Sequence, residues 1–161
     1  MKHIISALVE NKPGVLANVA GMFAARAFNI DSLVVGRTED PDLSRMTIVV
    51  VGDDKVVEQV RKQLAKIVPV VKVKDFVGKP VVARDLMLIS VNAAPEKRPE
   101  LLSVIEMFKG KVVDIGQKFV MIEVSGPEEK IEAFINLCRP YGIKDVARTG
   151  TIAMARHETS S

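Results

Sequence analysis

Hydrophobic residues along the chain recur with the spacing of a β-strand in some segments and with the spacing of a helix in others. The residues from His3 to Glu10 have the pattern of a β-strand. After the turn Asn11-Lys12-Pro13-Gly14, apolar residues recur with helical spacing. Strand-like segments and helical segments then follow one another. The elements predicted for the first part of the chain are a strand at 3–10, a helix at 15–28, strands at 30–37 and 44–51, a helix at 53–66 and a strand at 68–76.

The same order of elements begins again after a stretch that contains Gly78 and Pro80. This second set comprises a strand at 84–93, a helix at 99–108, strands at 112–115 and 119–124, a helix from 127 to about 138 and a strand at 143–148. The pattern predicts an α+β protein of two successive ferredoxin-like βαββαβ domains, with antiparallel sheets and helices on one face. We place these domains at 1–77 and 84–161, joined by a linker at 78–83, and expect 157–161 to fray.

The two helices of the first domain differ in their surfaces. The helix at 53–66 has one apolar face, with Val56, Val60, Leu64 and Ile67, and is polar elsewhere. The helix at 15–28 is apolar almost all round, because only Asn18 and Arg26 interrupt it. One stripe suits the sheet and comprises Leu16, Val19, Phe23 and Ala27; a second, of mostly small residues, comprises Ala17, Gly21, Ala24 and Phe28. The second stripe predicts a homodimer interface, with packing under the second domain as the alternative.

Composition narrows the classes of function. The chain has 161 residues, 48% of them hydrophobic, and a net charge of +3 that is spread through mixed-sign segments. Since no basic block is present, neither nucleic acid nor a membrane surface is indicated as a partner. Cys138 is the only cysteine, which excludes an intrachain disulfide and a multi-cysteine metal site. With no run of about 18 apolar residues and no signal peptide, a cytoplasmic protein is expected.

Several spaced segments carry a resemblance to one family. They are Asn11-Lys12-Pro13-Gly14-Val15-Leu16, Phe28-Asn29-Ile30-Asp31-Ser32-Leu33 and Asp42-Leu43-Ser44-Arg45-Met46-Thr47-Ile48. Together they resemble the small regulatory subunits of acetolactate synthase, whereas the Pro-Gly-Val-Leu turn alone is common to many ACT domains, which are small amino-acid-sensing modules. The second half is similar only in outline, through Arg84-Asp85-Leu86-Met87-Leu88-Ile89 and Ala147-Arg148-Thr149-Gly150.

The resemblance implies an N-terminal ACT domain that dimerises and binds valine, or leucine or isoleucine, between two chains. The first turn of one chain and the Asn29 region of the other would hold this effector. A helix start at Gly14 suits a carboxylate, because unpaired N–H groups and the helix dipole are exposed there and no Cβ blocks the approach. The implied effector-binding residues are Asn11, Pro13, Gly14, Val15, Leu16, Asn29 and Ile30.

Three of these residues also have purely structural explanations. Gly14 can serve the turn before the helix, and Asn11 can close an Asx turn on the Pro-Gly step. Asn29 stands where a left-handed residue could end the helix. The family pattern favours contact with the ligand for all three.

The resemblance also implies that this chain is not an enzyme by itself. It would activate a separate large catalytic subunit and confer feedback inhibition on it. Thiamine diphosphate, Mg²⁺ and FAD are expected on that partner, since no residue here is singled out as catalytic or metal-binding. An ACT-domain regulator of another metabolic enzyme is the main alternative.

Two rival functions share the βαββαβ order. An RNA-binding domain would present aromatic residues on its central strands, and the segments 3–9 and 44–51 contain no stacking aromatic residue. A small acyl-phosphate enzyme would need an anion ligand, for which Arg26 or Arg45 are the candidates.

Overall fold

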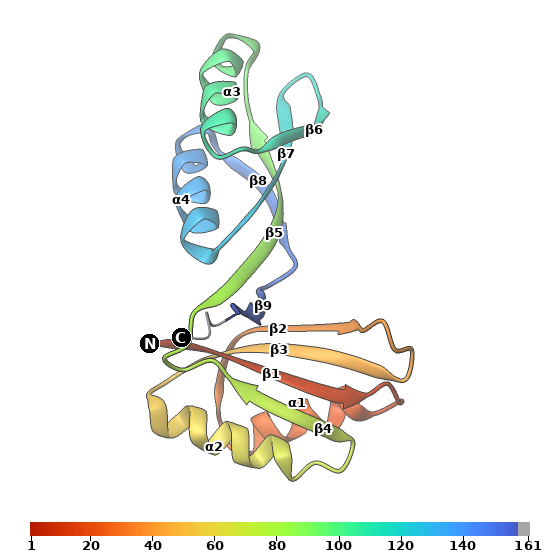
Figure 1. The fold of residues 1–161 in the computed structure, drawn as a ribbon. Helices are drawn as coiled ribbons and strands as arrows, with labels where there is room; N and C mark the ends of the chain where they lie inside the picture. The colour runs from red at the N-terminus through yellow and green to blue at the C-terminus, as the bar shows by residue number, and fades with distance from the viewer. Residues whose placement is uncertain (158–161) are drawn as a thin grey trace. The chain divides into compact units, whose positions relative to one another are not determined.

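The computed structural model describes residues 1–157, which form two compact units (Figure 1). Of these residues, the first unit comprises 1–82 and 151–157, and the second comprises 83–150. Each unit contains an antiparallel sheet with two helices on one face. The predicted fold class is therefore confirmed.

The first unit follows the predicted order of elements. These are β1 (Lys2–Glu10), α1 (Val15–Ala25), β2 (Asn29–Arg37), β3 (Leu43–Val51), α2 (Asp54–Ala65) and β4 (Val70–Asp75). The strands lie in the order β2-β3-β1-β4, so β2 and β4 are the edges. The buried side chains Val19, Phe23, Val60 and Leu64 pack against Ile5 and its neighbours on the sheet. This burial supplies the main stabilisation of the unit.

Helix α2 matches its prediction closely at its start. The Asp53 carboxylate caps the helix by accepting a hydrogen bond from the Val56 N–H at 3.0 Å. Val57, Val60 and Leu64 are buried, whereas Val56 and Ile67 are only half-buried. The buried face is therefore turned slightly from the one that the spacing predicts.

Helix α1 ends three residues earlier than predicted, at Ala25. Ala27 adopts a left-handed conformation with φ of 54°, and the Ala27 N–H donates to the Ala24 carbonyl at 3.2 Å. The Phe28 N–H donates to the Phe23 carbonyl, also at 3.2 Å, which completes a Schellman-type end. The left-handed residue is therefore Ala27, and Asn29 is instead the first residue of β2.

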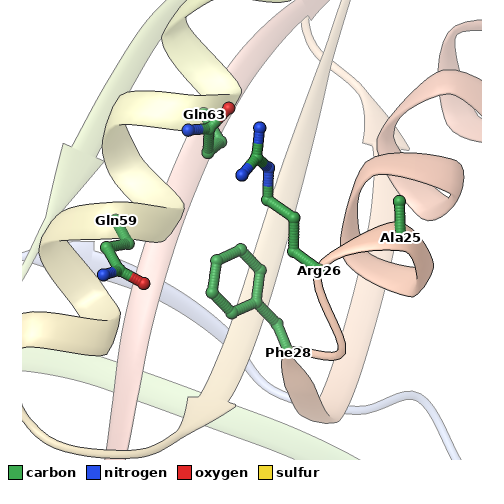
Figure 2. Close-up of a pocket in the computed structure, with 5 residues that line it drawn as sticks. All are labelled: Ala25, Arg26, Phe28, Gln59 and Gln63. Atoms are coloured by element: carbon green, nitrogen blue, oxygen red, sulfur yellow. The ribbon is translucent and has the colours of Figure 1, made fainter.

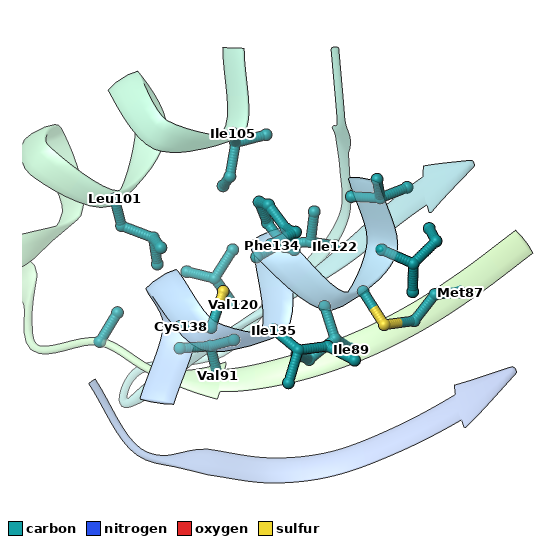
Figure 3. Close-up of a cluster of buried hydrophobic side chains, with 13 residues drawn as sticks. Met87, Ile89, Val91, Leu101, Ile105, Val120, Ile122, Phe134, Ile135 and Cys138 are labelled. Atoms are coloured by element: carbon teal, nitrogen blue, oxygen red, sulfur yellow. The ribbon is translucent and has the colours of Figure 1, made fainter. Parts of the chain in front are cut away.

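The second unit repeats the arrangement around its own core. Its elements are β5 (Val81–Asn92), α3 (Arg98–Met107), β6 (Lys111–Ile115), β7 (Phe119–Gly126), α4 (Glu128–Cys138) and β8 (Ile143–Arg148), with 3-10 turns at Pro95–Lys97 and Arg139–Tyr141. The strand order is β6-β7-β5-β8. Phe134 and Cys138 of α4 are fully buried against the sheet, as Figure 3 shows.

The boundary between the units differs from the predicted one. Strand β5 already begins at Val81, inside the segment 78–83 that the Gly and Pro residues marked as a linker. A further strand, β9 (Ile152–Ala155), pairs with β5 and was not predicted. The Thr151 N–H donates to the Ser32 hydroxyl at 3.2 Å, which ties this segment to the first unit. Of the segment predicted to fray, 158–161 lie outside the described residues.

A buried ion pair fixes one end of the second sheet. Asp85 is 2% exposed, and its Oδ2 accepts hydrogen bonds from Nη2 and Nε of Arg148 at 2.7 and 3.0 Å. Arg148 Nη1 also reaches Glu132 at 2.7 Å. Burial acts to lower the pKa of Arg148, but the two carboxylates outweigh it and raise that pKa. The guanidinium is therefore a permanent charge that compensates the buried carboxylate.

Candidate functional site

The first turn of α1 presents open backbone donors. Gly14 has φ of +83°, a left-handed conformation that glycine adopts at little cost, and no atom lies within 4 Å of where a Cβ would stand. No side chain caps the helix. Within residues 1–157, the N–H groups of Leu16 and Ala17 have no acceptor, and the Val15 N–H reaches the Lys12 carbonyl only at 3.5 Å. The turn can therefore receive an anionic group.

Asn11 joins this turn to the β2–β3 loop. Its Nδ2 donates to the Pro41 carbonyl at 3.0 Å, and its N–H donates to the Asp42 carbonyl at 2.7 Å. This pairing with the loop replaces the Asx turn that could have explained the residue. The side-chain oxygen keeps its full capacity to accept a hydrogen bond from a ligand, because no donor reaches it within the described part of the chain.

The aliphatic residues at the turn divide between core and surface. Val15 is 4% exposed and packs in the core of the first unit, whereas Leu16 is 47% exposed. Pro13 is exposed beside Gly14. Of the two aliphatic residues at this turn that were predicted to bind the effector, Leu16 reaches the surface, whereas Val15 belongs to the core.

Asn29 and Ile30 lie at the opposite end of the sheet. Asn29 pairs with Val51, which in turn pairs with Lys2 at the start of β1. Asn11 follows the far end of β1, and a nine-residue strand is about 26 Å long. One chain therefore does not bring the two halves of the predicted effector site together. Asn29 is exposed, and Ile30 is half-buried against the core.

The predicted dimer surface is open in the single chain. Ala17, Gly21 and Ala24 are exposed along α1, and a Cβ at Gly21 would meet nothing within 4 Å. Phe28 differs from them, because it is half-buried and its ring lies edge-on to Phe23 at 5.9 Å between centroids. Phe28 therefore serves the chain's own core. Strand β2 is an edge of the four-stranded sheet and was not singled out from the sequence.

A concave feature lies between the end of α1 and α2. It has a volume of about 400 Å³ and is lined by Ala25, Arg26, Phe28, Gln59 and Gln63. Figure 2 shows the Arg26 side chain extending toward Gln63, with the Phe28 ring beside it and Gln59 across the cleft. The sequence marked Arg26 only as a possible anion ligand, and it predicted only a polar surface for the part of the second helix that lines this cleft.

The other potentially reactive side chains among residues 1–157 do not form a catalytic or metal centre. His3 is 9% exposed, and its Nε2 lies 3.7 Å from an Asp54 oxygen without a hydrogen bond. Burial raises the pKa of the Cys138 thiol to about 11, which makes it unreactive. No cluster of three or more His, Cys, Asp and Glu residues suited to a metal occurs among residues 1–157. In the same range no helix combines the length and apolar character needed to cross a membrane.

Comparison with known proteins agrees for both units. Residues 5–72 match the family model described as the AHAS small subunit-like ACT domain, and residues 84–157 match the model described as the small subunit of acetolactate synthase. A protein of Archaeoglobus fulgidus named "Probable acetolactate synthase small subunit" is 57% identical over 97% of this chain and 98% of that protein. The acetolactate synthase small subunit of Bacillus subtilis is 46% identical over 97% of this chain and 91% of its own length.

A solved structure supports the same assignment. The crystal structure of the acetolactate synthase small subunit from Thermotoga maritima superposes with a TM-score of 0.92 and 44% sequence identity, covering 99% of each chain. The similarity to this structure and to the relatives extends over both units of the chain. The chain belongs to the acetolactate synthase small-subunit family.

Proposed function

We propose that this chain is the regulatory subunit that binds a branched-chain amino acid, valine foremost, at the interface of two copies and thereby controls the catalytic subunit of acetolactate synthase. One observation carries the proposal. The open turn at Gly14 and the exposed Asn29 lie at opposite ends of the first unit, next to the small-residue surface of α1. A two-fold dimer with antiparallel α1 helices would place each turn beside the Asn29 of the second copy.

The three groups of an amino acid then have matching partners. The effector's carboxylate is received by the free N–H groups of Leu16 and Ala17 at the positive end of the α1 dipole. Its ammonium group donates to side-chain amide oxygens, of Asn11 and of Asn29 from the second copy. The aliphatic side chain lies against Leu16 and the second copy's Ile30. A branched aliphatic effector is favoured because Leu16 and Ile30 offer it apolar contacts.

The catalytic chemistry belongs to the large subunit in this proposal. Thiamine diphosphate, Mg²⁺ and FAD are assigned to that partner, and the small subunit raises its activity and makes it sensitive to valine. We expect the complex to work in the cytoplasm. Family membership favours acetolactate synthase over any other ACT-regulated enzyme as the target.

Reconstitution tests the proposal directly. Pyruvate condensation is measured with this chain alone, with the cognate catalytic subunit alone and with both, each across a titration of valine. We expect no turnover by this chain, a higher rate for the mixture than for the catalytic subunit, and inhibition by valine only in the mixture. Leucine and isoleucine in parallel titrations establish which effector binds best. Thiamine-dependent turnover by the small subunit alone, or a mixture that is indifferent to all three amino acids, would refute it.

A further inference from the structure

The cleft between the end of α1 and α2 has the features of a second ligand site. Its volume of about 400 Å³ falls within the range of small-molecule pockets. Two of its five lining residues, Gln59 and Gln63, come from α2, which contributes nothing to the proposed effector site. The cleft is also at the far end of α1 from Gly14, about 16 Å away along an eleven-residue helix. Within one chain the cleft is therefore separate from the turn at Gly14.

Charge in the cleft favours an anion. Arg26 is the only charged residue among those that line it, and within residues 1–157 its guanidinium makes no ion pair or hydrogen bond. The nearest acid along α2, Glu58, is engaged by Arg61 and Lys62, and the hydrogen bond from Arg61 is the main cause that lowers the pKa of Glu58. A ligand carboxylate would thus meet an uncompensated guanidinium, whose planar donors bind carboxylates in pairs.

Two amides and one aromatic ring complete the site. Gln59 and Gln63 are four residues apart on α2 and therefore share one helix face, turned toward Arg26 in Figure 2. Each amide offers two N–H donors and one acceptor, and neither has a partner among the described residues. The Phe28 ring forms an apolar wall that is fixed by its edge-on contact with Phe23. The wall is thus in place before any ligand arrives.

We propose that this cleft binds a small 2-oxo or 2-hydroxy carboxylic acid. The carboxylate pairs with Arg26, the oxo or hydroxyl oxygen accepts from the amides of Gln59 and Gln63, and a short aliphatic chain lies on Phe28. A 2-amino acid is disfavoured, because its ammonium group would lie beside the Arg26 guanidinium with no carboxylate lining the cleft to offset the two like charges. The preference separates this site from the proposed effector site, which takes the amino acid.

Titration of the full-length chain tests the proposal. Calorimetry with 2-oxobutyrate and with lactate measures affinity, and nitrogen-correlated NMR spectra report on the side-chain amides of Gln59 and Gln63. Arg26→Gln should weaken 2-oxobutyrate binding at least tenfold. The matched control Arg37→Gln removes one exposed cation from the same unit and should change the affinity less than twofold. Gln59→Leu combined with Gln63→Leu should abolish the preference for 2-oxobutyrate over butyrate.

Further probes distinguish specific binding from simple anion binding. Inorganic phosphate should bind at least tenfold more weakly than 2-oxobutyrate. In Gly14→Asp, whose effector site should no longer bind valine, added valine should leave the side-chain amide signals of Gln59 and Gln63 unchanged. That variant should still bind 2-oxobutyrate normally, so failure of the effector site and failure of this site are told apart. The proposal is overturned if 2-oxobutyrate does not bind at millimolar concentration, if phosphate binds equally well, or if Arg26→Gln binds like the wild type.

Discussion

Replacing Gly14 with aspartate separates the fold of the first turn from its proposed role. A non-glycine residue at φ of +83° costs about 1 kcal/mol, although aspartate tolerates the left-handed region better than most residues. The added Cβ meets no atom within 4 Å, so no steric clash is added. A negative charge at the start of α1 returns roughly 0.3 to 1 kcal/mol through the helix dipole. We therefore expect Gly14→Asp to fold with a stability within about 1 kcal/mol of the wild type.

The effect on effector binding should be much larger. The new carboxylate would stand beside the free N–H groups of Leu16 and Ala17 and compete with the carboxylate of valine. Hydrogen bonds to a charged group contribute about 1.5 to 3 kcal/mol, and like-charge repulsion acts in the same direction. A loss of about 2 to 3 kcal/mol corresponds to an affinity roughly 30- to 150-fold lower. Feedback should be abolished at ordinary valine concentrations, while activation of the catalytic subunit survives.

The assay is a valine titration of the reconstituted enzyme, with the uninhibited rate and the half-inhibiting concentration measured separately. Gly14→Ala is the matched control, since it adds the Cβ and the backbone strain without the charge, and it should shift the half-inhibiting concentration less than tenfold. An unaltered valine response in a folded Gly14→Asp protein would remove Gly14 from the site. Loss of activation together with inhibition would show that the turn serves assembly instead.

Three further substitutions test the dimer, the second unit and its core. Ala24→Arg should convert the dimer to a monomer on size-exclusion chromatography by placing a charge in the small-residue surface, whereas Ala65→Arg on α2 should elute like the wild type. Asp85→Ala should lower the free energy of unfolding in urea by about 2 kcal/mol, because Arg148 keeps only Glu132, and Asp114→Ala should not. Burial raises the pKa of Cys138 from 9.0 to about 11, so the thiol stays protonated in the folded chain at pH values where it ionises in the unfolded chain. The free energy of unfolding should therefore fall between pH 9 and 11, and it should fall less in Cys138→Ala.

Local periodicity explains what the sequence predicted well. The period-2 and helical segments placed every strand and helix of the two repeats, and the predicted start of α2 was accurate because its cap, Asp53, depends only on neighbouring residues. The end of α1 was not predictable, because Ala27 has no intrinsic preference for the left-handed region and adopts it only with Phe28 packed in the core. Strand β9 was missed since its partner β5 begins some 70 residues earlier in the chain.

The candidate site was likewise predictable only where its residues are close together in the sequence. Gly14 and Asn11 were identifiable because the turn and the helix start lie within one short segment, and the structure adds the loop contact of Asn11 that no pattern encodes. The cleft at Arg26 depends on two helices meeting, and Gln59 and Gln63 differ in no way from other polar residues on α2. Their spacing of four residues was the only available signal. A site formed between elements is therefore visible only after the elements are assembled.

Separation of the two halves of the proposed effector site would link effector binding to dimerisation. Gly14 and Asn29 lie at opposite ends of the sheet within one chain, so each site of the proposed kind would need one contribution from each of two copies. A two-fold dimer then carries two equivalent sites. Because an effector that binds only the dimer stabilises it by mass action, valine should shift the monomer–dimer equilibrium toward the dimer as its concentration rises above the dissociation constant. The converse follows from the same linkage: a substitution in the α1 surface that weakens the dimer must weaken valine binding, even when it touches neither Gly14 nor Asn29.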